Sequence, residues 1–295
     1  MIGDRRVVLV GILLAVSLLA ASCSSGGQGS AARAPEQTIQ NKGSDTMVNL
    51  ALAWAEAYAK RRPEVRVSVT GGGSGTGIAA LFNGTVDIAN ASRALTEEEK
   101  ATARQMGFEA VEEVVALDAI AVVVHPSNPV DALTIPQLSD IFTGRITNWR
   151  EVGGEDRPIV LVSRESNSGT YAYFLEQVVR QGRDDSQDLF SPNALLMPSS
   201  EGISNEVRQN PNAIGYDGLG YVTPDQKVIR VAVAPGAPAV APSPETVKDG
   251  SYPIARPLYM VTRGKPAGAV AEYLEWIKGP EGQAIVRELG FVPLQ

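Results

Sequence analysis

The sequence is poor in the residues from which many functional sites are built. Its 295 residues include one cysteine and one histidine. A single cysteine excludes a disulfide framework and a cysteine-built zinc site, and a single histidine excludes a metal site with several histidine ligands. The net charge of −7 lacks the basic excess expected of a nucleic-acid-binding protein. What remains is a globular composition, 44% hydrophobic and 20% charged, long enough for one large or two ordinary domains.

Long apolar runs are also missing. The apolar run of residues 7–20 carries no charge and is shorter than the roughly 20 residues that span a bilayer. It follows Arg5 and Arg6 and ends in small residues, which is typical of a secretory signal. The only cysteine stands at the expected cleavage point and resembles the lipidated residue of a bacterial lipobox. We therefore predict a signal peptide over residues 1–22 and lipidation at Cys23; a plain cleaved signal is the alternative.

The segment after Cys23 is small, polar and rich in glycine and serine (residues 24–35, SSGGQGSAARAP). Such a segment buries too little apolar surface to order itself. We expect residues 23–37 to form a lipid-anchored flexible tether. The rest of the chain would then lie outside the cytoplasm, tied to a membrane surface.

The body of the chain alternates strand-like and helix-like segments. Residues 65–70 alternate with period two, and residues 114–124 form a nearly continuous apolar run, as in a strand buried on both faces. Helices are predicted over residues 168–182 and over residues 267–289, the latter broken at Gly279-Pro280. This alternation predicts an α/β architecture.

Three short turns combine glycine with serine and threonine: residues 43–47 (GSDTM), 71–77 (GGGSGTG) and 166–171 (SNSGTY). Each lies where a helix is expected to begin. Unpaired N–H groups at a helix start, close backbone approach at glycine and hydroxyl donors together suit an anion. One such turn is weak evidence because Ser and Thr are ordinary helix caps. Three in one chain favour an anion site.

Two arginines stand beside these turns. Arg93 and Arg164 each follow a predicted strand, and ligands of open α/β sheets bind at the carboxyl ends of strands. The planar guanidinium fork suits oxyanions. A surface ion pair is the alternative for either residue.

Catalytic motifs do not fit. No lysine follows the glycines of residues 71–77, so a P-loop is excluded, and no G-x-S-x-G is present. A Ser-His-Asp triad would have to use His125, which stands before a proline in a turn-like segment. Asp118 interrupts an apolar run and would either anchor the chain there or face a ligand. Residues 97–99, three glutamates, are predicted to be solvated charges at a helix start.

The order and spacing of these motifs resemble the phosphate-binding lipoproteins and periplasmic proteins of phosphate ABC importers. The resemblance covers nearly the whole body and is carried by residues 43–47, 70–81, 86–95, 125–130, 138–154, 163–174, 213–222 and 252–264. It implies an α/β, two-lobed type II periplasmic-binding-protein fold with a ligand cleft between the lobes. One lobe would comprise residues 38–118 plus 256–295 and the other residues 119–255.

The resemblance also implies the phosphate ligands, which in this chain are Ser44, Thr46, Ser74, Arg164, Ser168, Gly169 and Thr170. Some members carry an aspartate where this chain has Arg93, and that aspartate accepts the proton of hydrogen phosphate. Arginine cannot accept a hydrogen bond. We therefore add Arg93 as a cation of the site and hypothesise that Asp45, or else Asp118, supplies the acceptor.

The predicted function is capture of inorganic phosphate and its delivery to an ABC permease with a cytoplasmic ATPase. No catalysis, cofactor, metal or nucleic-acid partner is expected, and the protein is expected to be a monomer held by its lipid anchor at the extracytoplasmic face of the cell membrane, on the cell surface or in a periplasm. The alternatives are binding of another tetrahedral oxyanion such as sulfate, a secreted phosphatase or hydrolase, and a surface sensor or adhesin.

Overall fold

The computed structural model describes residues 37–294. The predicted signal peptide and Cys23 lie outside the described residues. The strands are β1 (Gln37–Gly43), β2 (Val65–Thr70), β3 (Ile88–Ala91), β4 (Ala110–Val124), β5 (Ala132–Thr134), β6 (Val160–Arg164), β7 (Leu195–Met197), β8 (Ala213–Gly218), β9 (Lys227–Ala232) and β10 (Ala255–Arg263).

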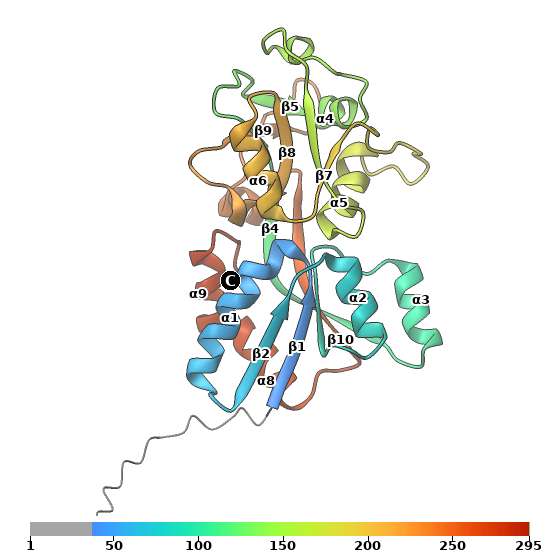
Figure 1. Cartoon of the computed structure of the whole chain (residues 1–295), viewed down its shortest axis with the longest axis vertical. Coiled ribbons are helices and arrows are strands. Elements are labelled where there is room, and N and C mark those ends of the chain that lie inside the picture. Colours follow the sequence, from blue (N-terminus) through green and yellow to red (C-terminus); the bar gives the residue numbers. More distant parts are fainter. Residues whose placement is uncertain (1–36, 295) are drawn as a thin grey trace, which may run out of the picture. The chain divides into compact units, whose positions relative to one another are not determined.

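The helices alternate with these strands along the chain (Figure 1). They are α1 (Val48–Arg61), α2 (Ser74–Phe82), α3 (Glu97–Gln105), α4 (Ile135–Phe142), α5 (Gly169–Phe174), α6 (Ser200–Gln209), α7 (Pro244–Lys248), α8 (Gly268–Lys278) and α9 (Pro280–Glu288). Single 3₁₀ turns lie at η1 (Asp45–Met47), η2 (Trp149–Val152) and η4 (Leu219–Tyr221), and η3 (Leu175–Val179) is a π turn. Among the described residues no helix is long and apolar enough to cross a membrane.

Strand β4 joins two lobes. It pairs with β10 as far as Ala119, then with β8 from Ile120 and with β9 from Val122. The order β2-β1-β3-β10-β4 forms the sheet of the first lobe, and β4-β8-β6-β7 continues into the second (Figure 1). The α/β, two-lobed fold is thus confirmed. The described residues belong to one compact unit, so the residue boundaries of the two lobes stay a prediction.

Apolar side chains cover both faces of each sheet. In β4, Ala121 and Val123 pack with Ile203 and Val207 of α6. The alternate residues Ile120, Val122 and Val124 pack on the opposite face, among the aromatic residues of α4 and α5. The predicted burial of this strand on both faces is confirmed, which explains why its sequence is apolar without alternation.

Helix boundaries follow local signals in most places. Thr96 caps α3 in a reciprocal capping box with Glu99, and Gly279 separates α8 from α9 as predicted. The helix predicted over 168–182 is shorter: α5 ends at Phe174 and a π turn follows to Val179. Gln181 and Gly182 then adopt positive φ angles, which ends helical geometry before the predicted boundary.

Candidate functional site

The three hydroxyl-bearing turns predicted from the sequence meet in the structure. Asp45 of the first turn accepts a hydrogen bond from the Gly72 N–H of the second, over 2.9 Å. The second turn meets the third where the Gly75 N–H donates to the Asn167 carbonyl oxygen and the Asn167 side chain donates to the Gly72 carbonyl oxygen, each over 3.0 Å. Residues more than 90 positions apart in sequence are thereby joined directly.

The first and third turns also share a side-chain hydrogen bond. The hydroxyl oxygens of Thr46 and Thr170 lie 2.8 Å apart and are buried. Thr46 belongs to η1 and Thr170 to α5, so this bond crosses from the first lobe to the second. Both hydroxyls can rotate to donate to an anion placed between the turns.

The close approach of the turns requires glycine at position 169. A side chain there would overlap the Ser74 hydroxyl and lie 2.6 Å from the Ser92 hydroxyl oxygen. Ser74 itself accepts a hydrogen bond from the Ser92 N–H over 3.1 Å. Ser168 caps α5 by accepting from the N–H groups of Thr170 and Tyr171. The candidate hydroxyls of this region are all at most 3% exposed: Ser44, Thr46, Ser74, Ser168 and Thr170.

Arg164 lies at the carboxyl end of β6 and is buried. Its Nη2 donates to Asp45 Oδ2 over 2.8 Å, an ion pair that joins the two lobes. Its Nη1 donates to the Ser200 hydroxyl over 3.1 Å, and its Nε donates to the Met197 carbonyl oxygen over 3.2 Å. The first turn thus holds the guanidinium group through Asp45, and the segment from Met197 to Ser200 holds its other side; the role of Arg164 as an oxyanion ligand stays a prediction.

A second buried arginine of the cluster was missed by sequence reasoning. Arg256 of β10 donates through Nη2 to the Thr170 hydroxyl over 3.0 Å and lies 3.5 Å from the Thr46 hydroxyl oxygen. Its Nη1 donates to the Ser92 carbonyl oxygen over 2.9 Å. The available signal was an arginine inside an otherwise apolar segment expected to pass between the lobes.

Asp118 holds Arg256 in place. The two residues are directly opposite in the antiparallel pairing of β4 and β10, with Asp118 Oδ2 2.9 Å from Arg256 Nη2 and both side chains fully buried. Burial raises the pKa of Asp118, and the neighbouring guanidinium opposes that rise. Its Oδ1 accepts from the Leu219 N–H over 3.1 Å. Of the two roles left open for Asp118, the structure supports the anchoring one.

Arg93 does not join the cluster. Both of its terminal nitrogens donate to the Glu99 carboxylate, each over 2.7 Å. Hydrogen bonding to Glu99 raises the pKa of Arg93. The capping box explains the geometry, because Glu99 reaches back to the Thr96 N–H and so comes beside Arg93. The expectation that Glu99 is a solvated charge is wrong, and the cation that contacts the hydroxyls is Arg256 instead of Arg93.

A third carboxylate beside the cluster was also missed. Asp217 lies near the end of β8 and is 1% exposed. Its Oδ1 accepts from the Gly218 N–H over 2.8 Å, whereas Oδ2 has no hydrogen-bond partner within residues 37–294. Burial raises its pKa to about 6, opposed by Arg164 and by the Ser200 hydroxyl.

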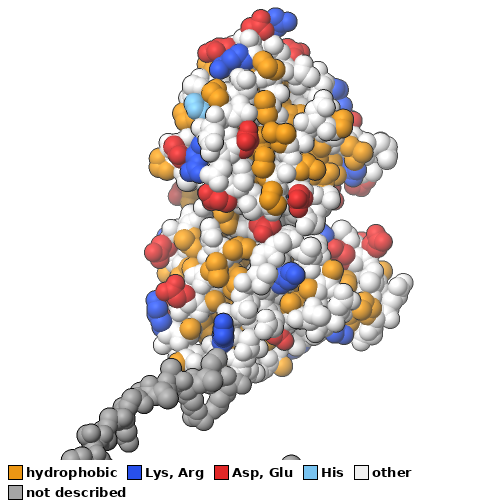
Figure 2. All heavy atoms as spheres, in the orientation of Figure 1, with side chains coloured by type: hydrophobic (Ala, Val, Ile, Leu, Met, Phe, Trp, Pro, Cys, Tyr) orange, Lys and Arg blue, Asp and Glu red, His pale blue; other side chains and the backbone are white. Residues whose placement is uncertain are grey.

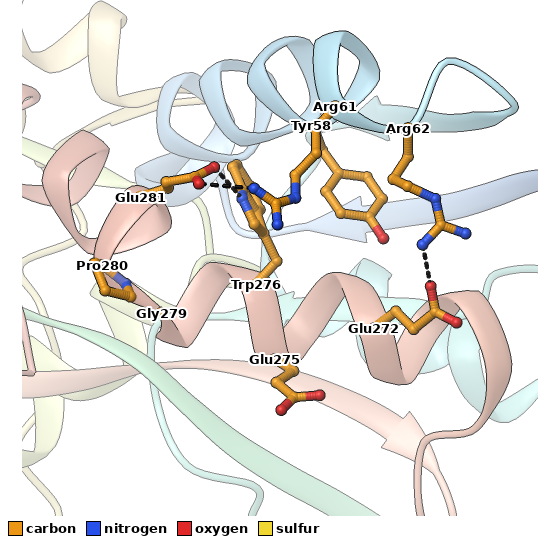
Figure 3. Close-up of a pocket in the computed structure, with 9 residues that line it drawn as sticks. All are labelled: Tyr58, Arg61, Arg62, Glu272, Glu275, Trp276, Gly279, Pro280 and Glu281. Carbon is orange, nitrogen blue, oxygen red and sulfur yellow. Dashed lines mark hydrogen bonds and ion pairs between the residues drawn. The ribbon is translucent and has the colours of Figure 1, made fainter.

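Three other features of the described residues do not add to the candidate site. His125 lies in a turn where its Nδ1 is 2.8 Å from the Ser127 hydroxyl, as expected of a turn histidine. Residues 37–294 contain no group of three or more His, Cys, Asp or Glu side chains that could hold a metal ion. The hollow drawn in Figure 3 lies between α1, α8 and α9, and its charged groups largely pair with each other, as Arg61 does with Glu281 over 2.7 Å.

The charge of the cluster contrasts with that of the whole chain. Figure 2 shows acidic and basic side chains interspersed on the face in view, consistent with a modest net charge of −7. In the cluster, the Arg256 guanidinium lies against the Thr46 and Thr170 hydroxyls, and the buried Arg164 guanidinium is paired with Asp45. Fixed dipoles and paired cations of this kind suit a small, multiply bonded oxyanion.

The family match agrees with this geometry. A PBP superfamily domain model matches residues 29–281. The phosphate-binding protein PstS of Pseudomonas aeruginosa is 32% identical over 273 residues, covering 87% of this chain and 83% of the relative. The chain belongs to the PstS family of phosphate-binding proteins.

Other members of the PstS family are similarly close. The phosphate-binding protein PstS of Bacillus subtilis is 30% identical over 98% of this chain and 94% of its own. A putative phosphate ABC transporter substrate-binding protein from Clostridium perfringens, solved with bound phosphate, is 34% identical, covers 88% of this chain and 100% of its own, and superposes with a TM-score of 0.77.

Proposed function

We propose that this protein is the extracytoplasmic phosphate-binding component of an ABC importer. The observation that carries the proposal is the meeting of three hydroxyl-bearing turns around two buried arginines, Arg164 and Arg256. The relatives that share about a third of its sequence are named as phosphate-binding proteins, and one was solved with phosphate bound. Geometry and family therefore support the same ligand.

The proposed ligand-binding residues come from both lobes. Hydroxyls and N–H groups of the three turns would donate to the phosphate oxygens, and Arg164 would add a bidentate donor. The set keeps eight of the nine residues expected from the sequence, with Asp45 as the partner that orients Arg164 and without Arg93: Ser44, Asp45, Thr46, Ser74, Arg164, Ser168, Gly169 and Thr170. Arg256 joins this set, and Arg93 would contribute only if it left Glu99.

Binding would favour the closed arrangement of the lobes. The proposed lobes, residues 38–118 plus 256–295 and residues 119–255, are bridged by Asp45–Arg164 and Thr46–Thr170. A ligand that contacts both sides binds the closed state better and shifts the population toward it. The closed surface would then be recognised by the permease, whose cytoplasmic ATPase drives transport.

The cellular setting follows from the same family and from the N-terminal sequence. We propose a monomer anchored through Cys23 to the outer face of the cell membrane after removal of residues 1–22. A body that works outside the cytoplasm agrees with the family, whose members capture phosphate for import. Whether the anchor forms can be tested by mass spectrometry of the mature N-terminus, where Cys23→Ser should remove the lipid mass.

The enzyme alternative finds little support. His125, the only histidine of the sequence, bonds within its own turn. A phosphatase or serine hydrolase would need a base beside its nucleophile. The cluster instead supplies donors that can hold an oxyanion without breaking a bond, which suits a carrier.

Calorimetric titration of the purified, phosphate-stripped chain tests the proposal. Phosphate and arsenate should bind with one-to-one stoichiometry, and sulfate should bind far more weakly. No phosphate binding, or equal affinity for phosphate and sulfate, would overturn it. Loss of a hydrolytic activity on His125→Ala would instead revive the enzyme alternative.

A further inference from the structure

The cluster contains three carboxylates, and two of them are fully engaged. Asp45 uses Oδ1 for the Gly72 N–H and Oδ2 for Arg164. Asp118 uses Oδ1 for the Leu219 N–H and Oδ2 for Arg256. The sequence suggested Asp45 or Asp118 as the acceptor for a ligand proton. In the structure, both carboxylate oxygens of each residue already accept a hydrogen bond.

Asp217 differs from both. Its side chain is 1% exposed, yet its Oδ2 has no hydrogen-bond partner in the described part of the chain. A buried carboxylate oxygen without a donor is costly, and native structures leave few such atoms unpaired. The Ser200 hydroxyl is near enough to lower the pKa of Asp217, but by distance and angle Oδ2 itself has no partner in the described residues, so a group that donates a hydrogen bond is expected at that oxygen when a ligand is bound.

The surroundings of Asp217 place it beside the anion cluster. The parallel pairing of β6 with β8 joins Leu161 to Ile214, so extending this register by three residues puts Arg164 level with Asp217. The backbone of the next residue, Gly218, lies close to the cluster, because a Cβ atom there would be 2.9 Å from Thr46 Cγ2 and 3.0 Å from Asp118 Oδ2.

The charged and polar groups that face Asp217 come from every neighbouring element. Arg164 of β6 and Ser200 of α6 stabilise its anion, and Asp118 of β4 opposes it. Asp217 in turn raises the pKa of Tyr221 in η4, a smaller effect than that of burial. The glutamates of α6 interact with residues near them in sequence. Glu201 forms an ion pair with Arg208, and Glu206 accepts a hydrogen bond from Asn210.

We propose that Asp217 is the specificity-determining acceptor of the site, which receives a hydrogen bond from the O–H group of a protonated tetrahedral oxyanion. The inference rests on the proposed oxyanion-binding function. Near neutral pH, hydrogen phosphate and hydrogen arsenate carry such an O–H group, whereas sulfate does not. Sulfate would leave Oδ2 unpaired and place two anions side by side, and a site built for an O–H group can reject an analogue without it by about 10⁴-fold.

The proposal predicts how sulfate binding depends on pH. Sulfate stays unprotonated across the neutral and mildly acidic range, so any change in its affinity reports the protein. Burial raises the pKa of Asp217 to about 6. Below that pH the carboxyl group becomes neutral and can itself donate a hydrogen bond, so sulfate affinity should rise as the pH falls through about 6.

Competition calorimetry on the full chain and on Asp217→Asn tests this. The asparagine amide donates to either anion, so the ratio of phosphate to sulfate affinity should fall by at least about 100-fold. Sulfate affinity should no longer depend on pH near 6. Asp45→Asn should keep the pH dependence, and the exposed Asp185→Asn should keep both properties.

Two results would overturn the proposal: an unchanged selectivity ratio in Asp217→Asn, or a wild-type sulfate affinity that does not rise toward acid pH. The second measurement uses no variant, so it decides the matter even if Asp217→Asn does not fold. A wild-type chain that binds no phosphate would refute the proposed function, whereas phosphate binding with unchanged selectivity would refute only the role of Asp217.

Discussion

The two aspartate–arginine pairs of the cluster use the same chemistry in different structural settings. Asp118 and Arg256 face each other on adjacent strands, and both side chains are 0% exposed. Asp45 and Arg164 belong to a turn and a strand 119 positions apart, and the Asp45 side chain is 14% exposed. Sheet register holds the first pair, whereas the second exists only while the turns of both lobes meet.

This difference separates a structural pair from a working pair. A pair fixed by backbone pairing can orient a guanidinium toward Thr46 and Thr170 whether or not a ligand is present. Under the proposed closure, a pair between two lobes forms only when they come together, so Asp45 would orient the Arg164 guanidinium for a ligand in the closed state alone. The following predictions test that separation, in order of decreasing effect.

Breaking the register-held pair should have the largest effect. Arg256→Met leaves Asp118 as an unpaired buried charge and should lower the free energy of unfolding by about 3–5 kcal/mol. Urea denaturation without phosphate measures this. The double variant Asp118→Leu with Arg256→Met removes both charges and should recover most of the loss. A loss below about 1 kcal/mol in the single variant would place the pair with ordinary surface ion pairs.

The unpaired carboxylate, Asp217, should reveal itself in stability against pH. Burial raises its pKa from 3.8 to about 6, so the folded state holds this proton more tightly than the unfolded state. Stability should therefore fall as the pH rises from about 4 to about 6, by about 3 kcal/mol in total at about 1.4 kcal/mol per unit. Asp217→Asn should remove this fall, and Asp185→Asn should not. The prediction would be contradicted if the free energy of unfolding changed with pH in the same way for the wild type and for Asp217→Asn.

The pair that joins the lobes should matter most for binding. Arg164→Gln removes charged donors from the site and should weaken phosphate binding by about 10- to 150-fold, the equivalent of about 1.5–3 kcal/mol. Arg150→Gln is the matched control, because Arg150 is exposed and pairs with Asp156 in the same lobe. Calorimetry that found equal affinities for the two variants would remove Arg164 from the ligand set.

Much of the site could be predicted because its parts have local sequence signatures. The turns at 43–47, 71–77 and 166–171 carry their glycines and hydroxyls within a few residues, and Arg164 directly precedes one of them. Helix caps and the break at Gly279 are equally local. A single sequence therefore identified the three turns that meet in the structure, although it gave no distances between them.

What could not be predicted depends on register between distant strands. Arg256 reaches the hydroxyls because β10 pairs with β4, and Asp217 comes within the influence of the Arg164 charge because β8 pairs with β6. No pattern within a window of the sequence encodes either pairing. The same holds for Asp45, whose two oxygens are taken by groups from two other segments.

Arg93 gives the smallest expected effect and the sharpest test of the sequence prediction. Its guanidinium is held by both oxygens of Glu99, whose own position is fixed by the α3 capping box. Arg93→Gln should change phosphate affinity by less than about 5-fold, since a partly exposed pair away from the ligand contributes at most about 1 kcal/mol. Glu99→Gln provides the complementary measurement by freeing Arg93. If Arg93→Gln weakened binding as much as Arg164→Gln, and Glu99→Gln strengthened it, Arg93 would have to leave Glu99 and enter the cleft when phosphate binds.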